Sequence, residues 1–215
     1  MVRHIGPTYA LQELLYGLIM ALATISILAV ELGLDPGNRY IIAFAAVGVN
    51  ITWGLADMLM YLITKNFDRL RHQRMAEAIQ ADVDGDYPLE AIEDDLSETI
   101  VATLDPEDRK RIYLDILESE SRAVGRPQRI TASNLYGGLS CLLLTVMAAL
   151  PIAVPVLSID PLPLAVRSAS VVAMFLLFLT GYTWAPHASL PRWRTGLAMM
   201  GVGAIITVST LVLGG

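Results

Sequence analysis

The fold is decided by residues 40–63, YIIAFAAVGVNITWGLADMLMYLI, where a single charged residue, Asp57, interrupts an otherwise uncharged stretch. A helix of about 20 apolar residues crosses the roughly 30 Å hydrocarbon core of a bilayer. Residues 40–63 therefore predict a membrane-spanning helix. Four further stretches have the same character: 11–30, 135–157, 164–184 and 196–213. We expect an all-α polytopic membrane protein with five transmembrane helices.

The composition agrees with a membrane protein that carries one soluble part. Of 215 residues, 54% are hydrophobic and 17% are charged, and the mean hydropathy is +0.54. In soluble domains, about a quarter of the residues are charged. Residues 64–134 hold 26 of the 36 Lys, Arg, Asp and Glu residues. We expect transmembrane helices 1 and 2 in residues 1–63, a helical domain in residues 64–134, and transmembrane helices 3–5 in residues 135–215.

The distribution of basic residues predicts the orientation, because Lys and Arg of short loops stay on the cytoplasmic side. With the N-terminus inside, 13 of the 15 basic residues lie on the inner side, and Arg39 and Arg167 on the outer side. The N-terminus and residues 64–134 are then cytoplasmic and the C-terminus lies outside, in a plasma (inner) membrane. Arg167 would reach the headgroups or pair with Asp160.

Residues 64–134 predict three helices. The first continues the second span beyond Phe67, and the second follows Pro88 with apolar residues at helical spacing as far as Leu104. The third begins at Pro106 with Asp105 as its N-cap. With 16 acidic and ten basic residues, this part would repel phosphates, so we expect no nucleic-acid partner.

Three carboxylates in the acidic part are spaced four residues apart, at Glu90, Asp94 and Glu98. On a helix this spacing puts them on one face. Divalent cations accept such oxygen ligands, so the three residues are a candidate metal site. A solvated charged face is the commoner explanation of such a run.

Asp57 is the most informative residue within the apolar stretches. It lies about 10 Å from the inner end of the second span, where a charge facing lipid costs about 3 kcal/mol. It should therefore face a partner, water or an ion. Asn50 shares its helix face, together with Gly54 and Tyr61. Asn50 and Asp57 are predicted to line a transport path, or alternatively to make a structural hydrogen bond between helices.

The first span contributes two further candidates, because Glu13 and Met20 share one face with Gly17. Glu13 could instead be an ordinary interfacial residue. The lone cysteine, Cys141, lies in an apolar run, and we expect it to be a small, buried apolar side chain. No phosphate-binding loop, HExxH motif or catalytic Ser/His/Asp grouping is apparent, so we expect neither an enzyme nor a permanently bound cofactor.

Three segments of the apolar stretches carry a family resemblance: residues 11–18, LQELLYGL; the third span, with Pro151 and Pro155; and residues 194–203, RTGLAMMGVG. The first is similar to the opening Leu-Arg-Glu-Leu-Ile-Phe-Gly pattern of the vacuolar iron transporter family. The other two resemble the proline-ended third span and the glycine-rich last span of that family. The resemblance implies a homodimeric, proton-coupled exporter of ferrous iron and related divalent cations, with a path between spans one and two.

The chain also departs from the family pattern at its metal path. Ile19-Met20-Ala21 replaces the family's Asn-Asp-Gly, and the Gly-Glu-Tyr of span two is missing. Met58 is similar in position to the methionine that precedes that motif, and Asp57 beside it would be a relocated carboxylate. Two hypotheses follow: a divalent-cation transporter, or a non-transporting membrane scaffold or sensor of the same architecture.

Overall fold

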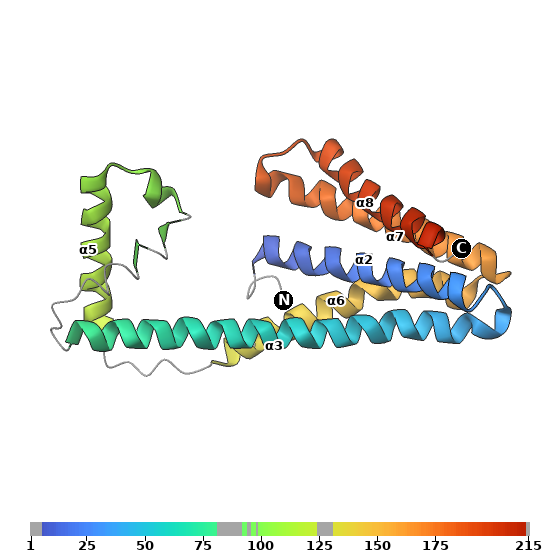
Figure 1. Cartoon of the computed structure of the whole chain (residues 1–215), viewed down its shortest axis with the longest axis horizontal. Coiled ribbons are helices and arrows are strands. Elements are labelled where there is room, and N and C mark those ends of the chain that lie inside the picture. Colours follow the sequence, from blue (N-terminus) through green and yellow to red (C-terminus); the bar gives the residue numbers. More distant parts are fainter. Residues whose placement is uncertain (1–5, 81–91, 94–95, 98, 124–130, 214–215) are drawn as a thin grey trace. The chain divides into compact units, whose positions relative to one another are not determined.

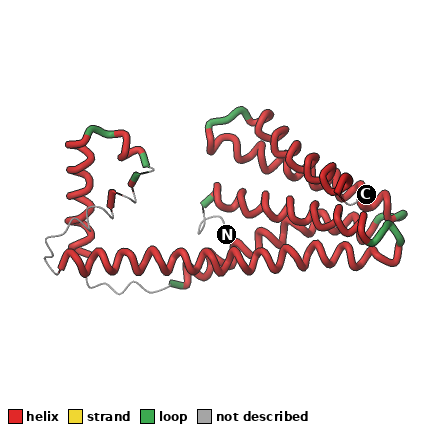
Figure 2. The backbone as a smooth tube through the Cα atoms, viewed as in Figure 1, coloured by secondary structure: helices red, strands yellow, loops and turns green. Residues whose placement is uncertain are grey.

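The computed structural model describes residues 6–80, 92–93, 96–97, 99–123 and 131–213. Over these ranges the regular structure is helical, without a strand (Figure 2). The α-helices, labelled in Figure 1, are α2 (Pro7–Glu31), α3 (Arg39–Gln80), α5 (Pro106–Ala123), α6 (Ala132–Ser158), α7 (Leu162–Trp184) and α8 (Arg192–Leu213). The chain divides into two compact units, Met1–Leu62 with Ala132–Gly215, and Ile63–Thr131.

Four helical segments of the described residues are long and apolar enough to cross a membrane. They are Pro7–Glu31, Pro36–Arg71, Ala132–Ser158 and Leu162–Ala188. Helices suit this environment because they satisfy their backbone hydrogen bonds internally. These segments confirm an all-helical protein and indicate that it is embedded in a membrane. The stretch expected as a fifth span, 196–213, lies within α8 and is not among these four.

The first unit is a helix bundle. α2 packs against α6, α7 and α8, while α6 packs against α7 and α7 against α8 (Figure 1). In the apolar window that contains the start of α3, 28% of the residues are buried, the same share as for α7, against 56% for α6. The core combines large aliphatic side chains with alanines that let helices approach closely. Examples are Leu22, Ile25, Ile42, Ile152, Leu177, Ala165, Ala169 and Ala173.

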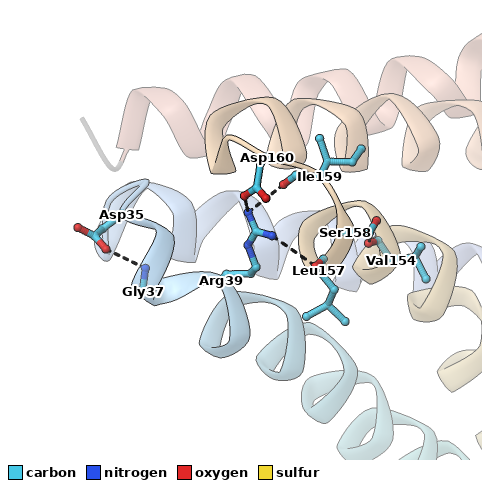
Figure 3. A network of polar contacts seen from close by, with 8 residues as sticks. All are labelled: Asp35, Gly37, Arg39, Val154, Leu157, Ser158, Ile159 and Asp160. Carbon is cyan, nitrogen blue, oxygen red and sulfur yellow. Dashed lines mark hydrogen bonds and ion pairs between the residues drawn. The ribbon is translucent and has the colours of Figure 1, made fainter.

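The connection from α2 to α3 is organised by two polar side chains. The side-chain amide of Asn38 donates a 2.7 Å hydrogen bond to the carbonyl oxygen of Leu32, just after α2 ends. The Asp35 carboxylate accepts a 2.8 Å bond from the backbone N–H of Gly37 (Figure 3). This bond caps the short 3₁₀ helix η1 (Pro36–Asn38), from which α3 begins directly.

The second unit agrees with the prediction at its two ends and differs in the middle. α3 continues without interruption to Gln80, and α5 begins at Pro106, as expected. The predicted helix ending at Leu104 is wrong in its last part. Thr99 is extended, and its hydroxyl accepts a bond from the N–H of Val101 and starts the 3₁₀ helix η2 (Ile100–Thr103). Threonine competes for backbone hydrogen bonds in this way and so interrupts helices.

A small apolar cluster stabilises the described part of the second unit. Ile92 and Tyr113 are buried, and Leu96, Val101 and Ile116 pack against them. Of the apolar residues at helical spacing after Pro88, Ile92 and Leu96 lie in this cluster, whereas Ile100 is 82% exposed and Leu104 is 38% exposed. The periodicity therefore identified the inward side chains only as far as Thr99, the residue that precedes η2.

Candidate functional site

Glycines bring three helices of the first unit together. A Cβ atom on Gly17 of α2 would lie 2.7 Å from the carbonyl oxygen of Thr145 on α6. A Cβ atom on Gly54 of α3 would lie 2.9 Å from a side-chain carbon of Leu142, also on α6. Larger residues would hold these helices apart. The close approach places the polar residues of α2, α3 and α6 within reach of one another.

The central feature of this interface is a pair of carboxyl groups. Glu13 of α2 is 4% exposed, so its side chain faces the interior of the helix bundle. Its carboxyl group interacts electrostatically with that of Asp57 on α3, which is partly buried. Two carboxylates in contact repel each other unless a proton or a cation lies between them. The pair therefore favours a bound proton or cation.

α6 adds two side chains to the carboxyl pair. The hydroxyl of Thr145, fully buried, lies 3.1 Å from Oε2 of Glu13 and 3.0 Å from the carbonyl oxygen of Cys141. The Cys141 thiol lies 3.5 Å from the carbonyl oxygen of Gly137 and interacts electrostatically with Glu13. Cys141 is 0% exposed, which confirms the buried position expected for it. Sequence reasoning missed its interaction with Glu13.

The sequence did contain a signal for the contribution of α6. Thr145 and Cys141 are four residues apart and so share one face of an apolar helix. Gly137 and Gly138 continue that face, and both are buried. A polar and small-residue face on a membrane helix marks a contact with another helix. It does not reveal which helix is the partner.

Two buried side-chain oxygen atoms on α3, one of them in the carboxyl pair itself, have no hydrogen-bond partner. Asn50 is 0% exposed, and its side-chain amide donates a 3.1 Å bond to the carbonyl oxygen of Gly17. Its Oδ1 atom and Oδ2 of Asp57 are buried without a partner. A buried acceptor left unpaired costs about 1–3 kcal/mol, so it commonly marks the place of an unseen proton, water or ion. Seven residues, or about 10 Å, separate Asn50 and Asp57 along α3.

The two candidate methionines lie elsewhere. Met20 lines an open apolar groove of about 490 Å³ with Ala45, Gly48, Val49, Thr52, Trp53 and Ala56. None of the other candidate residues lines this groove. Met58 packs against α6, where a Cβ atom on Gly138 would lie 3.1 Å from its Cγ atom. The structure thus unites Glu13, Asn50 and Asp57 at the interface of α2, α3 and α6, with Met58 beside them and Met20 apart.

The acidic metal candidates cannot be placed. Glu90, Asp94 and Glu98 lie outside the described residues. Where the structure does describe the chain, no group of three or more His, Cys, Asp or Glu side chains is arranged to hold a metal ion. The carboxyl pair supplies two acidic ligands, so additional oxygen atoms would have to come from Thr145, backbone or water.

No protein-family model matches this chain, and no curated protein matches it.

Proposed function

We propose that this protein is a membrane transporter of divalent metal cations, which exchanges its cargo for protons at Glu13 and Asp57. The observation that carries the proposal is the buried contact between these two carboxyl groups within an apolar helix bundle. Ionisable residues are expensive inside a membrane and mark ion or proton pathways there. In this proposal the transported cation is iron or manganese, or a similar divalent metal, as the resemblance to the vacuolar iron transporters implies.

The chemistry of exchange follows from charge balance. When both carboxyls are ionised, their two negative charges match one divalent cation. When the cation leaves, protons restore neutrality, so neither state leaves a net charge in the apolar interior. The hydroxyl of Thr145 adds a neutral oxygen atom beside Glu13 that suits a hard or borderline cation, and the unpartnered Oδ1 of Asn50 offers another oxygen atom about two helical turns farther along α3.

The proposed topology has five spans, with α8 as the fifth. The N-terminus and residues 64–134 lie in the cytoplasm and the C-terminus outside, in a plasma (inner) membrane, as the Lys and Arg distribution predicts. The acidic residues Glu90, Asp94 and Glu98 then collect cations on the cytoplasmic side. A homodimer completes the proposal, since the family resemblance implies one.

One observation favours the alternative, a non-transporting scaffold or sensor. A carboxyl–carboxyl interaction between helices can serve stability alone, as polar contacts within membranes do. In the described part of the chain no third acidic, cysteine or histidine ligand joins Glu13 and Asp57 to form a metal-holding group. In this alternative, the spans anchor residues 64–134, which bind metal or a partner.

Cation flux into proteoliposomes tests the proposal. Vesicles containing the full chain are assayed with Fe(II), Mn(II) and Co(II), against empty vesicles. Glu13→Gln and Asp57→Asn should each abolish flux. Glu31→Gln is the matched control, because Glu31 ends the same helix but is exposed. No flux above empty vesicles, or full flux in Asp57→Asn, contradicts transport.

A second measurement on the full chain separates the alternative. Cation binding is measured by calorimetry for the unaltered protein and for a variant with Glu90→Gln, Asp94→Asn and Glu98→Gln. Binding that disappears in this triple variant, in a protein that supports no flux, favours the sensor. Binding that requires Glu13 and Asp57 favours the transporter.

A further inference from the structure

A layer of apolar side chains separates the carboxyl pair from the Arg39 end of the bundle. Leu22 and Ile25 of α2, Ile42 of α3, and Ile152 and Val156 of α6 are each 0% exposed and belong to one contiguous core. On all three helices they lie beyond the polar residues, in the direction of Arg39. Leu22 is nine residues from Glu13 along α2, about 13 Å at helical rise.

Arg39 closes the same end of the bundle with three contacts. Its guanidinium donates hydrogen bonds to the carbonyl oxygens of Ile159 (2.9 Å) and Leu157 (3.4 Å) and pairs with the Asp160 carboxylate (Figure 3). The side chain is 12% exposed. Carbonyls at a helix C-terminus carry partial negative charge, so an arginine there is well placed. These contacts fasten the start of α3 to the end of α6. Asp160, expected to be near Arg167, belongs to this clamp.

The opposite end of the interface is held differently. Tyr61 of α3 lies over Gly137 of α6, where an added Cβ atom would be 2.5 Å from its hydroxyl oxygen. Met58 lies against Gly138 in the same way. Both Tyr61 and Met58 are only partly buried, unlike the fully buried aliphatic layer.

We propose that the aliphatic layer and the Arg39 clamp form a gate, closed in this structure, which opens when α3 separates from α6 at the Arg39 end. This inference rests on the proposed function, since it says how the carboxyl pair gains access to the outer side. A transporter exposes its site to one side at a time, which requires a closed and an open arrangement of the same elements. Arg39 stabilises the closed arrangement.

Thiol labelling tests the gate without any transport assay. Cys141→Ala removes the native thiol, and Ala46→Cys places a reporter on α3 at a position that is 0% exposed within the layer. Leu34→Cys, in the exposed connection between α2 and α3, reports full access and identifies which side of the vesicle this end faces. A membrane-impermeant maleimide is added to sealed vesicles. We expect rapid labelling at Leu34→Cys and protection at Ala46→Cys.

Opening of the clamp should remove that protection. Arg39→Gln should raise the labelling rate at Ala46→Cys by about tenfold or more, because the open arrangement becomes more populated. Asp160→Asn should raise it less, since both carbonyl contacts remain. Arg167→Gln is the matched control, an exposed arginine on α7 outside the clamp, and should change nothing.

Each outcome decides the inference. Rapid labelling of Ala46→Cys beside an intact Arg39 would show that this end is already open. Unchanged protection in Arg39→Gln would show that α3 and α6 stay in contact without Arg39, so they would not form a gate. Equal labelling in Arg39→Gln and Arg167→Gln would also overturn it. If Arg39→Gln no longer elutes as a monodisperse protein, its labelling reports unfolding. Arg39→Lys, which keeps a hydrogen-bond donor, then replaces it. We expect its labelling rate at Ala46→Cys to lie between those of the unaltered Arg39 and Arg39→Gln. Protection that depends on Arg39 in a protein without flux would leave the gate standing and remove the proposed function.

Discussion

Asn50 of α3 donates a 3.1 Å hydrogen bond from its side-chain amide to the backbone carbonyl oxygen of Gly17 on α2. The bond fixes the axial position of α2 against α3. Glu13 and Gly17 are one helical turn apart on α2, and Asn50 and Asp57 are two turns apart on α3. Fixing one contact therefore helps to bring the two carboxyl groups together. The side-chain oxygen of Asn50, Oδ1, is buried without a hydrogen-bond partner.

Asn50→Leu should reduce both stability and flux. It removes the bond to Gly17, and interhelical hydrogen bonds in membranes contribute about 1 kcal/mol. We expect a lower midpoint of thermal unfolding in detergent, together with lost cation uptake. Thr52→Val is the control, because the exposed Thr52 hydroxyl bonds only to its own helix at Gly48. An Asn50→Leu protein with unchanged melting and uptake would remove Asn50 from the site.

Gly17→Ala should separate α2 from α6. The added methyl would lie 2.7 Å from a backbone oxygen and 2.8 Å from Cβ of Ala148, which cannot be relieved by moving a flexible side chain. Overpacking of this kind costs about 1–3 kcal/mol. Gly48→Ala is the matched control, since a methyl there meets nothing within 4 Å. Thermal unfolding of the two variants measures the difference, and equal melting would contradict the close packing at Gly17.

Thr145→Val should lower flux, whereas Thr145→Ser should retain it. Valine matches threonine in shape but removes the hydroxyl that lies 3.1 Å from Glu13. We expect a weaker apparent affinity for the cation and roughly a tenfold loss of uptake at low cation concentration, corresponding to about 1.4 kcal/mol. Uptake measured over a range of cation concentrations checks this. A serine variant as impaired as the valine variant would assign Thr145 to packing alone.

Acidification of the side that loads the cation should weaken binding. Protons and the cation compete for the same carboxyl oxygens, so affinity rises with pH until both groups are ionised. In Glu13→Gln only Asp57 remains to titrate, and the dependence on pH should become shallower. Cation binding by calorimetry at several pH values measures both slopes. A binding constant that is independent of pH would exclude exchange between cation and proton at this pair.

The helix faces could be predicted from the sequence, because periodicity is a local property. Asn50, Gly54, Asp57 and Tyr61 were expected on one polar face of the second span. In the structure they contact Gly17, Leu142, Glu13 and Gly137 respectively. A charge or amide within hydrocarbon must face other helices, so its direction follows from its own helix alone.

The partners of that face could not be predicted in the same way. Thr145 follows Glu13 by 132 positions, and nothing in either segment indicates their relative height in the bundle. The same holds for Arg39, which meets α6 more than a hundred residues later. Met20 shows the converse, since it shares a helix face with Glu13 yet lies in a groove away from the pair. Position along one helix does not specify which neighbour packs there.

The sequence by itself determined that this chain forms apolar helices, with its charges gathered in one segment and a carboxylate inside the second span. Long apolar runs and the cost of a buried charge suffice for that. Only the tertiary structure decided that Glu13 meets Asp57, that Thr145 and Cys141 complete the cluster, and that Arg39 clamps α6. These contacts depend on how closely Gly17 and Gly54 let three helices approach, which is set by packing in three dimensions.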